Sequence, residues 1–310
     1  MATDGRSIRF TLRQLQYFSA VARTGQISLA AAECHVSQST MTAAVAELER
    51  LLGSLLFERV RNGVVLTQEG HQFLQHARNV LDVAQDAANH PFRKRSEVSG
   101  TLQVAASYTV LGYFLLPFLA RFQKQHPGVR VVPVELDRAS IERHLAAGDI
   151  EMAVALTSNL SDARRFHRVP LARSRRQLWV AANHPLAEMS QISLRDASPY
   201  PYVIPMVDDG DIGARRYWKE AGLQPSSFLA TSSMEAVREM VALGFGVTIL
   251  SDMVFRPWSL DGRRIRTVPL KDPIAPMEVG LMWLKGRRLD PVAEVLRRYL
   301  EPAAAQHPHN

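Results

Sequence analysis

The sequence predicts a multidomain α/β protein with a small helical domain at its start. None of the 17 prolines falls within residues 1–90, and a proline-free stretch suits helices. Two short helical patterns with a tight turn between them, followed by an Asn-Gly pair, occupy residues 28–66. From residue 100 onward, strand-like apolar runs alternate with helical patterns, which is typical of an α/β domain.

The first domain, residues 1–66, begins with an amphipathic helix. Leu12, Leu15 and Phe18 recur at helical spacing, and the pattern stops at Gly25. We expect Ser28 to cap a second helix that runs to Cys34.

A third helix follows after a turn at His35-Val36, and the pair forms a helix-turn-helix. Ser37 is its predicted cap and Gly53 its end. The Asn62-Gly63 pair then lies between two apolar runs and predicts a hairpin, which would form a wing beside the helices.

Residues 67–92 predict one long helix with a narrow apolar seam. Its positions are spaced alternately by three and four residues: Leu74, Ala77, Leu81, Ala84 and Ala88. An isolated helix cannot bury such a seam, so the pattern favours pairing with a second helix as a dimerisation element. The alternative is that this helix packs on its own domain.

Residues 93–302 predict an α/β domain with largely parallel sheets. The expected strands are Leu102–Ala106, Val129–Leu136, Met152–Leu156, Gln177–Ala182, Tyr202–Met206, Phe228–Thr231, Val247–Leu250 and Val279–Leu284. The expected helices are Leu111–Gln125, Ile141–Ala147, Asp211–Ala221, Ser233–Leu243 and Pro291–Leu300. Ligands of such sheets bind at the carboxyl ends of strands.

Ten short motifs occur one after another along the chain. They are Leu12-Arg13-Gln14-Leu15-Gln16-Tyr17-Phe18, Ser28-Leu29-Ala30-Ala31-Ala32, Val36-Ser37-Gln38-Ser39, Leu48-Glu49, Leu55-Leu56-Phe57-Glu58-Arg59, Leu66-Thr67-Gln68-Glu69-Gly70, Leu115-Leu116-Pro117 with Phe122, His126-Pro127-Gly128-Val129, Gly148-Asp149-Ile150-Glu151 and Gly244-Phe245-Gly246-Val247. In this order and spacing, the chain resembles the LysR-type transcriptional regulator family over nearly its whole length.

The resemblance implies a winged helix-turn-helix, a dimerising linker helix, and an effector domain of two subdomains like a periplasmic solute-binding protein. We expect one subdomain to comprise residues 100–165 with 270–302, and the other residues 166–269. It also implies a transcriptional regulator, not an enzyme, that binds double-stranded promoter DNA as a homodimer or homotetramer. A small-molecule effector would control it, and RNA polymerase is a further candidate partner.

The candidate DNA contacts lie at the start of the third helix and in the wing: Ser37, Gln38, Ser39, Thr40, Thr42, Arg59 and Arg61. Gln38 can pair with adenine through two hydrogen bonds, whereas Ser37 is better placed to cap the helix or bind phosphate. Outside a helix-turn-helix these would be ordinary exposed polar groups. Where the family commonly has Arg and Gln, this helix has Ala43, Ala44 and Ala46, so base contacts must be fewer or come from the wing.

The candidate effector contacts are polar groups after strands with apolar residues nearby: Ser107, Tyr108, Thr109, Arg138, Thr157, Ser158, Ile204, Met206 and Ser232. Hydroxyl and backbone N–H groups at such positions can bind an anion, although helix capping explains them as well. Arg138 would pair with a carboxylate or phosphate, or would be a solvated surface cation. Tyr108, Ile204, Met206 and Phe245 could form apolar walls or core. We therefore expect a small anionic effector.

The composition of the chain argues against membrane, secreted and disulfide-containing proteins. The chain has 46% hydrophobic and 22% charged residues, no apolar run long enough for a membrane span and no leader-like start, so we expect a cytoplasmic protein without membrane contact. Its single cysteine, Cys34, excludes an intrachain disulfide and a multi-cysteine zinc site, and we read it as a small core residue instead of a reactive thiol.

No nucleophile elbow, zinc-protease motif or phosphate loop is present, so we expect no catalysis, cofactor or metal. The net charge of +7 is compatible with nucleic-acid binding but does not decide it. The remaining alternative is a nucleoid protein that binds DNA without a ligand.

Overall fold

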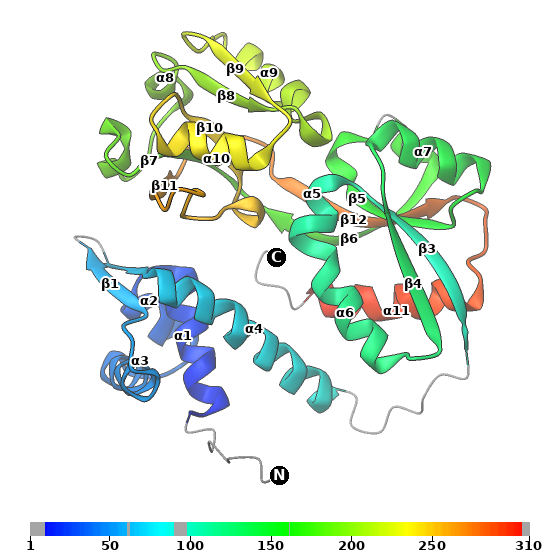
Figure 1. The fold of residues 1–310 in the computed structure, drawn as a ribbon, viewed down its shortest axis with the longest axis horizontal. Helices are drawn as coiled ribbons and strands as arrows, with labels where there is room; N and C mark the ends of the chain where they lie inside the picture. The colour runs from blue at the N-terminus through cyan, green and yellow to red at the C-terminus, as the bar shows by residue number, and fades with distance from the viewer. Residues whose placement is uncertain (1–9, 61–62, 90–97, 161, 306–310) are drawn as a thin grey trace. The chain divides into compact units, whose positions relative to one another are not determined.

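The computed structural model describes residues 10–60, 63–89, 98–160 and 162–305. The chain divides into two compact units, residues 1–94 and 95–310. Figure 1 shows the order of the elements within each unit.

The first unit confirms the predicted three helices, hairpin and long helix. Its elements are α1 (Leu12–Thr24), α2 (Ile27–Glu33), α3 (Gln38–Leu52), β1 (Phe57–Val60), β2 (Gly63–Leu66) and α4 (Gln68–Asn89). The strands pair antiparallel, with Phe57 opposite Leu66. Residues 90–92, the expected end of the long helix, lie outside the described residues.

Local capping fixes most of these boundaries. The Ser37 hydroxyl accepts a hydrogen bond from Thr40 N (3.1 Å), and α3 ends at Gly53, which adopts φ +71°. The expected cap at Ser28 is wrong, because α2 begins at Ile27. The carbonyl of Gln26 already accepts the first helical hydrogen bond, from Ala30 N.

Helix α4 packs closely on its own unit at its first turns. The Thr67 hydroxyl accepts from Gly70 N (2.9 Å) and donates to Leu55 O (2.8 Å), which joins the helix start to the hairpin. Leu74 and Ala77 are buried in one core with residues of α1, such as Phe18. At Leu74 and Ala77 the helix therefore packs on its own domain, and their expected role in dimerisation is corrected.

The rest of the predicted seam is less enclosed. Leu81 packs at the margin of the same core, Ala84 is half-buried and Ala88 is exposed. Among the described side chains of α4, the large apolar ones left exposed are Val80 and Val83, at 42% and 59%.

The second unit contains two α/β subdomains. The first is a five-stranded sheet in the order β4-β3-β5-β12-β6. Its strands are β3 (Gly100–Ala106), β4 (Val129–Glu135), β5 (Met152–Leu156), β6 (Phe166–Ser174) and β12 (Met277–Leu284). Its helices are α5 (Tyr108–Val110), a π-helical turn (Leu111–Leu115), α6 (Leu116–Gln125), α7 (Arg138–Ala147) and α11 (Pro291–Ala305).

Helices cover both faces of this sheet (Figure 1). Val104 of β3 packs in one core with α6 and α11, and the adjacent Ala105 packs in another with α7. Successive residues of a strand point to opposite faces, so both faces are apolar at the end of β3, where Val104-Ala105-Ala106 forms a continuous apolar run.

The second subdomain contains one three-stranded and one two-stranded sheet. Its strands are β7 (Arg176–Ala181), β8 (Tyr202–Pro205), β9 (Phe228–Thr231), β10 (Thr248–Ser251) and β11 (Ile265–Val268). Its helices are α8 (Leu194–Ala197), α9 (Gly210–Glu220) and α10 (Met234–Ala242). Helices α9 and α10 pack in separate cores on the two sides of β7 and β8.

Three expectations for this unit are corrected. The sheets are mixed, because β12 runs antiparallel to β5 and β6, and β7 antiparallel to β10 and β11. Strands β6 and β11 were not expected. The second subdomain does not begin at residue 166, because β6 pairs with β12 and the chain crosses over only after Ser174. Its end lies beyond residue 269, since Lys271 N still bonds to Ile192 O (2.8 Å).

We predict that Gly70→Ala destabilises the first unit, although alanine is the better helix former. A Cβ at Gly70 would lie 2.1 Å from Leu56 O, so the helix must shift away from the hairpin. We expect a loss of about 1–3 kcal/mol in the free energy of unfolding, measured by urea denaturation.

Gly112→Ala is the matched control. A Cβ at this helical glycine meets nothing within 4 Å, so alanine should be neutral or stabilising by up to about 1 kcal/mol. Equal effects at both positions would show that the close approach at Gly70 has no energetic consequence.

Candidate functional site

The start of α3 presents the predicted DNA contacts on an exposed helix end. The Ser37 hydroxyl lies 2.8 Å from both the Ser39 and Thr40 hydroxyls, and Thr42 Oγ1 donates to Gln38 O (2.8 Å). These hydroxyls are thus held by local hydrogen bonds. Gln38 is exposed and its side chain has no partner among the described residues, so its amide is available to a base edge.

The wing supplies one described cation. Arg59 is exposed on β1, while Arg61 lies outside the described residues. Among the described residues of this unit, Arg23 pairs with Glu33 (2.5 Å) and Arg50 with Glu47 (2.6 Å). Cys34 packs at the margin of the apolar core, and burial raises the pKa of its thiol, which favours a small core residue over a reactive one.

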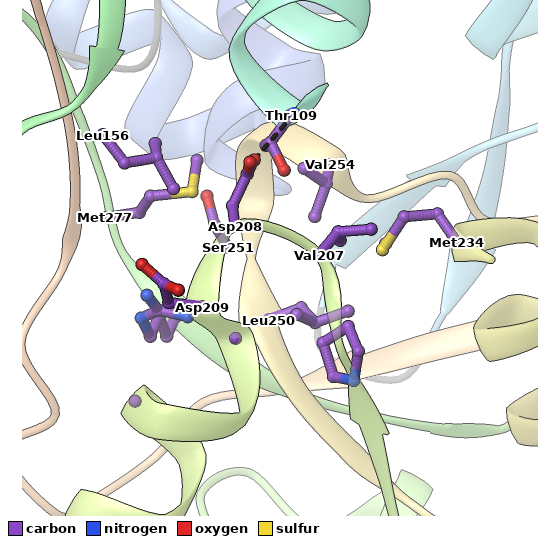
Figure 2. Close-up of a pocket in the computed structure, with 14 residues that line it drawn as sticks. Thr109, Leu156, Val207, Asp208, Asp209, Met234, Leu250, Ser251, Val254 and Met277 are labelled. Carbon is purple, nitrogen blue, oxygen red and sulfur yellow. Dashed lines mark hydrogen bonds between the residues drawn. The ribbon is translucent and has the colours of Figure 1, made fainter. Parts of the chain in front are cut away.

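The second unit contains a pocket between its two subdomains, with about 480 Å³ of empty space that includes open solvent. Figure 2 shows the side chains that surround it. It is lined by Thr109, Leu156, Arg176, Pro205, Val207, Asp208, Asp209, Gly210, Gly213, Met234, Leu250, Ser251, Val254 and Met277. Strand ends and the following turns from both subdomains contribute, as expected for an α/β binding site.

Of the nine sequence-predicted effector residues, Thr109 is the one that lines this pocket. Ser107, two residues before Thr109, is 3% exposed and its hydroxyl has no hydrogen-bond partner among the described residues. Tyr108 packs against the core around α10.

The other predicted residues lie away from the pocket lining. Ile204 is fully buried in the core beside α9, which corrects its assignment as a pocket wall. Met206 and Ser232 are exposed, and the cap of α10 is Ser233, not Ser232. Thr157 is half-buried and Ser158 is exposed.

The positions expected to receive an anion are already occupied by carboxylates of the chain. Thr109 N donates to Asp208 Oδ2 (2.8 Å), and the carboxyl group of Asp208 lies beside Thr109 in Figure 2. Arg138 donates to Asp209 Oδ2 (2.5 Å) and to Glu142 Oε1 (3.0 Å), so it is neither a solvated cation nor an open one. Hydrogen bonding to Asp209 raises the pKa of the Arg138 guanidinium.

Sequence reasoning missed the two aspartates and one cation. Asp208 and Asp209 both adopt left-handed backbone conformations, with φ of +53° and +58°. The signal was the Asp-Asp-Gly turn directly after a predicted strand. Arg176 was also missed: it lines the pocket, donates from Nε to Ala275 O (3.2 Å) and has no carboxylate partner among the described residues.

Among the described residues, no group of three His, Cys, Asp or Glu side chains is arranged to hold a metal ion. Nor does any helix in those ranges combine the length and apolarity that a bilayer crossing requires.

Curated relatives match the chain along its length. A hydrogen peroxide-inducible genes activator of Dickeya chrysanthemi is 26% identical over 95% of this chain and 99% of its own. A RuBisCO operon transcriptional regulator of Allochromatium vinosum is 28% identical, over 96% of this chain and 98% of its own. Among solved structures, HinK, a LysR family transcriptional regulator from Pseudomonas aeruginosa, has the same fold (TM-score 0.62, 24% identity, 95% and 98% coverage).

Family models match both units. Residues 12–71 match the bacterial regulatory helix-turn-helix protein of the lysR family, and residues 95–305 match the LysR substrate binding domain. The two matches follow the division that the coordinates make between a winged helix-turn-helix unit and a two-subdomain α/β unit. The chain belongs to the LysR family of DNA-binding transcriptional regulators, which carry an effector-binding domain.

Proposed function

We propose that this regulator reads its operator through the start of α3 and the wing, and responds to a small effector in the pocket between its subdomains. The pocket is the observation that carries this proposal, because residues of both subdomains line it. A ligand that touches both can favour one arrangement of the subdomains over another, which is the requirement for regulation by binding.

Gln38 is proposed as the base reader and Arg59 as a phosphate contact. Both are exposed, and Gln38 projects from the helix end that enters the major groove in such domains. Its amide can make two hydrogen bonds to adenine, whereas an arginine on the wing neutralises backbone charge regardless of sequence.

We predict that Gln38→Ala weakens binding to the cognate operator by about 1–3 kcal/mol and leaves binding to random DNA nearly unchanged. Arg59→Ala should weaken both and reduce the slope of affinity against salt by about one. Anisotropy titrations at several salt concentrations measure these effects. Gln72→Ala, at an exposed glutamine of α4, is the control. Equal losses for Gln38→Ala on both DNAs would make Gln38 a positioning residue.

We propose that α4 forms the dimer through its uncovered valines. Leu74 and Ala77 are already buried against α1, so the partner helix must meet Val80 and Val83 instead. A two-fold dimer would then present two α3 helices to paired half-sites.

We predict that Val83→Glu shifts the protein from dimer toward monomer, because it places an unpaired charge in the interface. The dimer dissociation constant should rise about a hundredfold or more, and operator affinity should fall with it. Sedimentation velocity measures the first effect. Leu260→Glu, at a residue 77% exposed in the other unit, is the control. A dimer unaffected by Val83→Glu would place the interface elsewhere.

Arg176 is proposed as the anchor for an anionic effector. It is the pocket cation that lacks a carboxylate partner in the described chain, whereas its neighbour Arg175 pairs with Asp252 (2.9 Å). Apolar walls beside one cation suit a small organic acid.

We predict that Arg176→Ala abolishes thermal stabilisation by the effector while sparing operator binding. A ligand at about 100 times its Kd adds about 2.7 kcal/mol to wild-type stability, so a thermal-shift panel of organic acids, amino acids and neutral analogues detects it. Arg175→Ala is the adjacent control. A panel of effectors that stabilises Arg176→Ala as well as wild type would contradict this anchor.

Two alternatives have weaker support. A nucleoid protein that binds DNA without a ligand would have no use for the pocket between the subdomains. A peroxide response through an intrachain disulfide does not follow from the likeness to peroxide-inducible activators, because Cys34 is the single cysteine. We propose further that the protein acts in the cytoplasm and that RNA polymerase is a partner at the promoter.

A further inference from the structure

Two aspartates of the second subdomain reach across the pocket to groups of the first. Asp208 accepts from Thr109 N at 2.8 Å, and Asp209 accepts from Arg138 Nε at 2.5 Å. Both contacts join segments far apart in the chain. We call this pair of contacts the aspartate clasp.

The clasp also indicates which chemical group the Thr109 N–H can bind. A carboxylate oxygen already fits Thr109 N, and a carboxylate has a second oxygen to satisfy. The buried Ser107 hydroxyl, two residues earlier, has no hydrogen-bond partner among the described residues. The Thr109 N–H is therefore a donor suited to a carboxylate, and it lies in the pocket lining, whereas Ser107 does not.

The backbone around the aspartates is strained. Asp208 and Asp209 both have positive φ, a conformation that aspartate tolerates but does not prefer. Residues held in such conformations cluster at ligand clamps and switch regions.

The pocket walls limit the rest of the ligand. Most lining side chains are apolar: Leu156, Pro205, Val207, Met234, Leu250, Val254 and Met277. A ligand that carries one carboxylate on an apolar body can place that charge between Thr109 N and Arg176, which both line the pocket, and its body against these walls.

We propose that the aspartate clasp is a built-in competitor of the effector, and that an organic monocarboxylate binds by displacing Asp208 from Thr109. This rests on the proposed effector pocket and specifies its ligand class and its regulation. Without ligand, the clasp holds the two subdomains together across the pocket. When the ligand carboxylate takes its place, the aspartates no longer restrain the second subdomain, whose angle to the first then changes.

The test measures the separation of the subdomains without needing operator or native effector. Ala147→Cys in α7 and Lys219→Cys in α9, both exposed, carry spin labels in a Cys34→Ser background. Pulsed electron paramagnetic resonance then gives the distribution of distances between the two spin labels, both for this protein and for the Asp208→Asn/Asp209→Asn variant. Asparagine keeps the shape and the tolerance of positive φ but removes the charges. Asp211→Asn/Glu220→Gln on α9 is the charge-matched control.

Calorimetry with hexanoate as the probe, and hexanamide as its neutral analogue, gives the second readout. We expect the clasp variant to show a shifted or broadened distance distribution before any ligand is added, and to bind hexanoate at least tenfold more tightly than wild type. Hexanoate should move the wild-type distribution in the same direction, and hexanamide should not. The control variant should behave as wild type, and circular dichroism confirms that each variant is folded.

An unchanged distance distribution in a folded clasp variant overturns the proposal, as does hexanoate affinity that stays the same or falls. Equal binding of hexanoate and hexanamide overturns it too. Failure of the proposed function reads differently: the clasp variant would still change the distance and the hexanoate affinity, but no acid would alter operator binding.

Discussion

The antiparallel ladder between β6 and β12 is the interaction on which the effector unit depends. It pairs Phe166 with Leu284 at one end and Ser174 with Met277 at the other, so the two crossings between subdomains start side by side. The Ser174 hydroxyl, 2% exposed, accepts from Met253 N (3.1 Å) and lies 2.7 Å from the Ser251 hydroxyl. Two adjacent strands anchored by a buried polar network form a narrow hinge. The pocket lies beside it, because Met277 at the end of the ladder and Arg176, two residues after Ser174, both line the pocket.

Elements fixed by local chemistry could be predicted from the sequence. The cap at Ser37, the end at Gly53 and the hairpin pairing of Val60 with Gly63 each depend on residues within a few positions. The two missed strands depend on distant pairing instead. β6 contains Pro170 and exposed arginines, and it is a strand because β12 pairs with it. Proline is tolerated there because β6 is an edge strand and the register shifts opposite Gly280.

The candidate site was predictable to the same extent. Placing hydroxyls after strands identified Thr109, since the carboxyl end of β3 opens on the pocket. The partner of Thr109 N comes from a residue 99 positions away, and no periodicity in the sequence connects the two. The long helix is a similar case: a seam of small and large apolar residues marked α4 as amphipathic, but only the packing of α1 decided that Leu74 and Ala77 face inward.

The energetics of the clasp suit a switch better than a permanent brace. Hydrogen bonds to charged groups contribute about 1.5–3 kcal/mol each, and a left-handed conformation costs about 1–2 kcal/mol per residue, less for aspartate. The free energy gained from the two contacts is therefore largely offset by the cost of two left-handed residues. Solvent reduces the gain further, because the side chains of Arg138 and Asp209 are 26% and 29% exposed. When two arrangements differ by only a few kcal/mol, a ligand that binds one of them modestly better can shift the equilibrium, since each tenfold difference in affinity is worth about 1.4 kcal/mol. Under the proposed competition, this balance also gives a reason for an acidic turn at the pocket, because an incoming carboxylate can compete for the partners of an aspartate but not for those of an apolar contact.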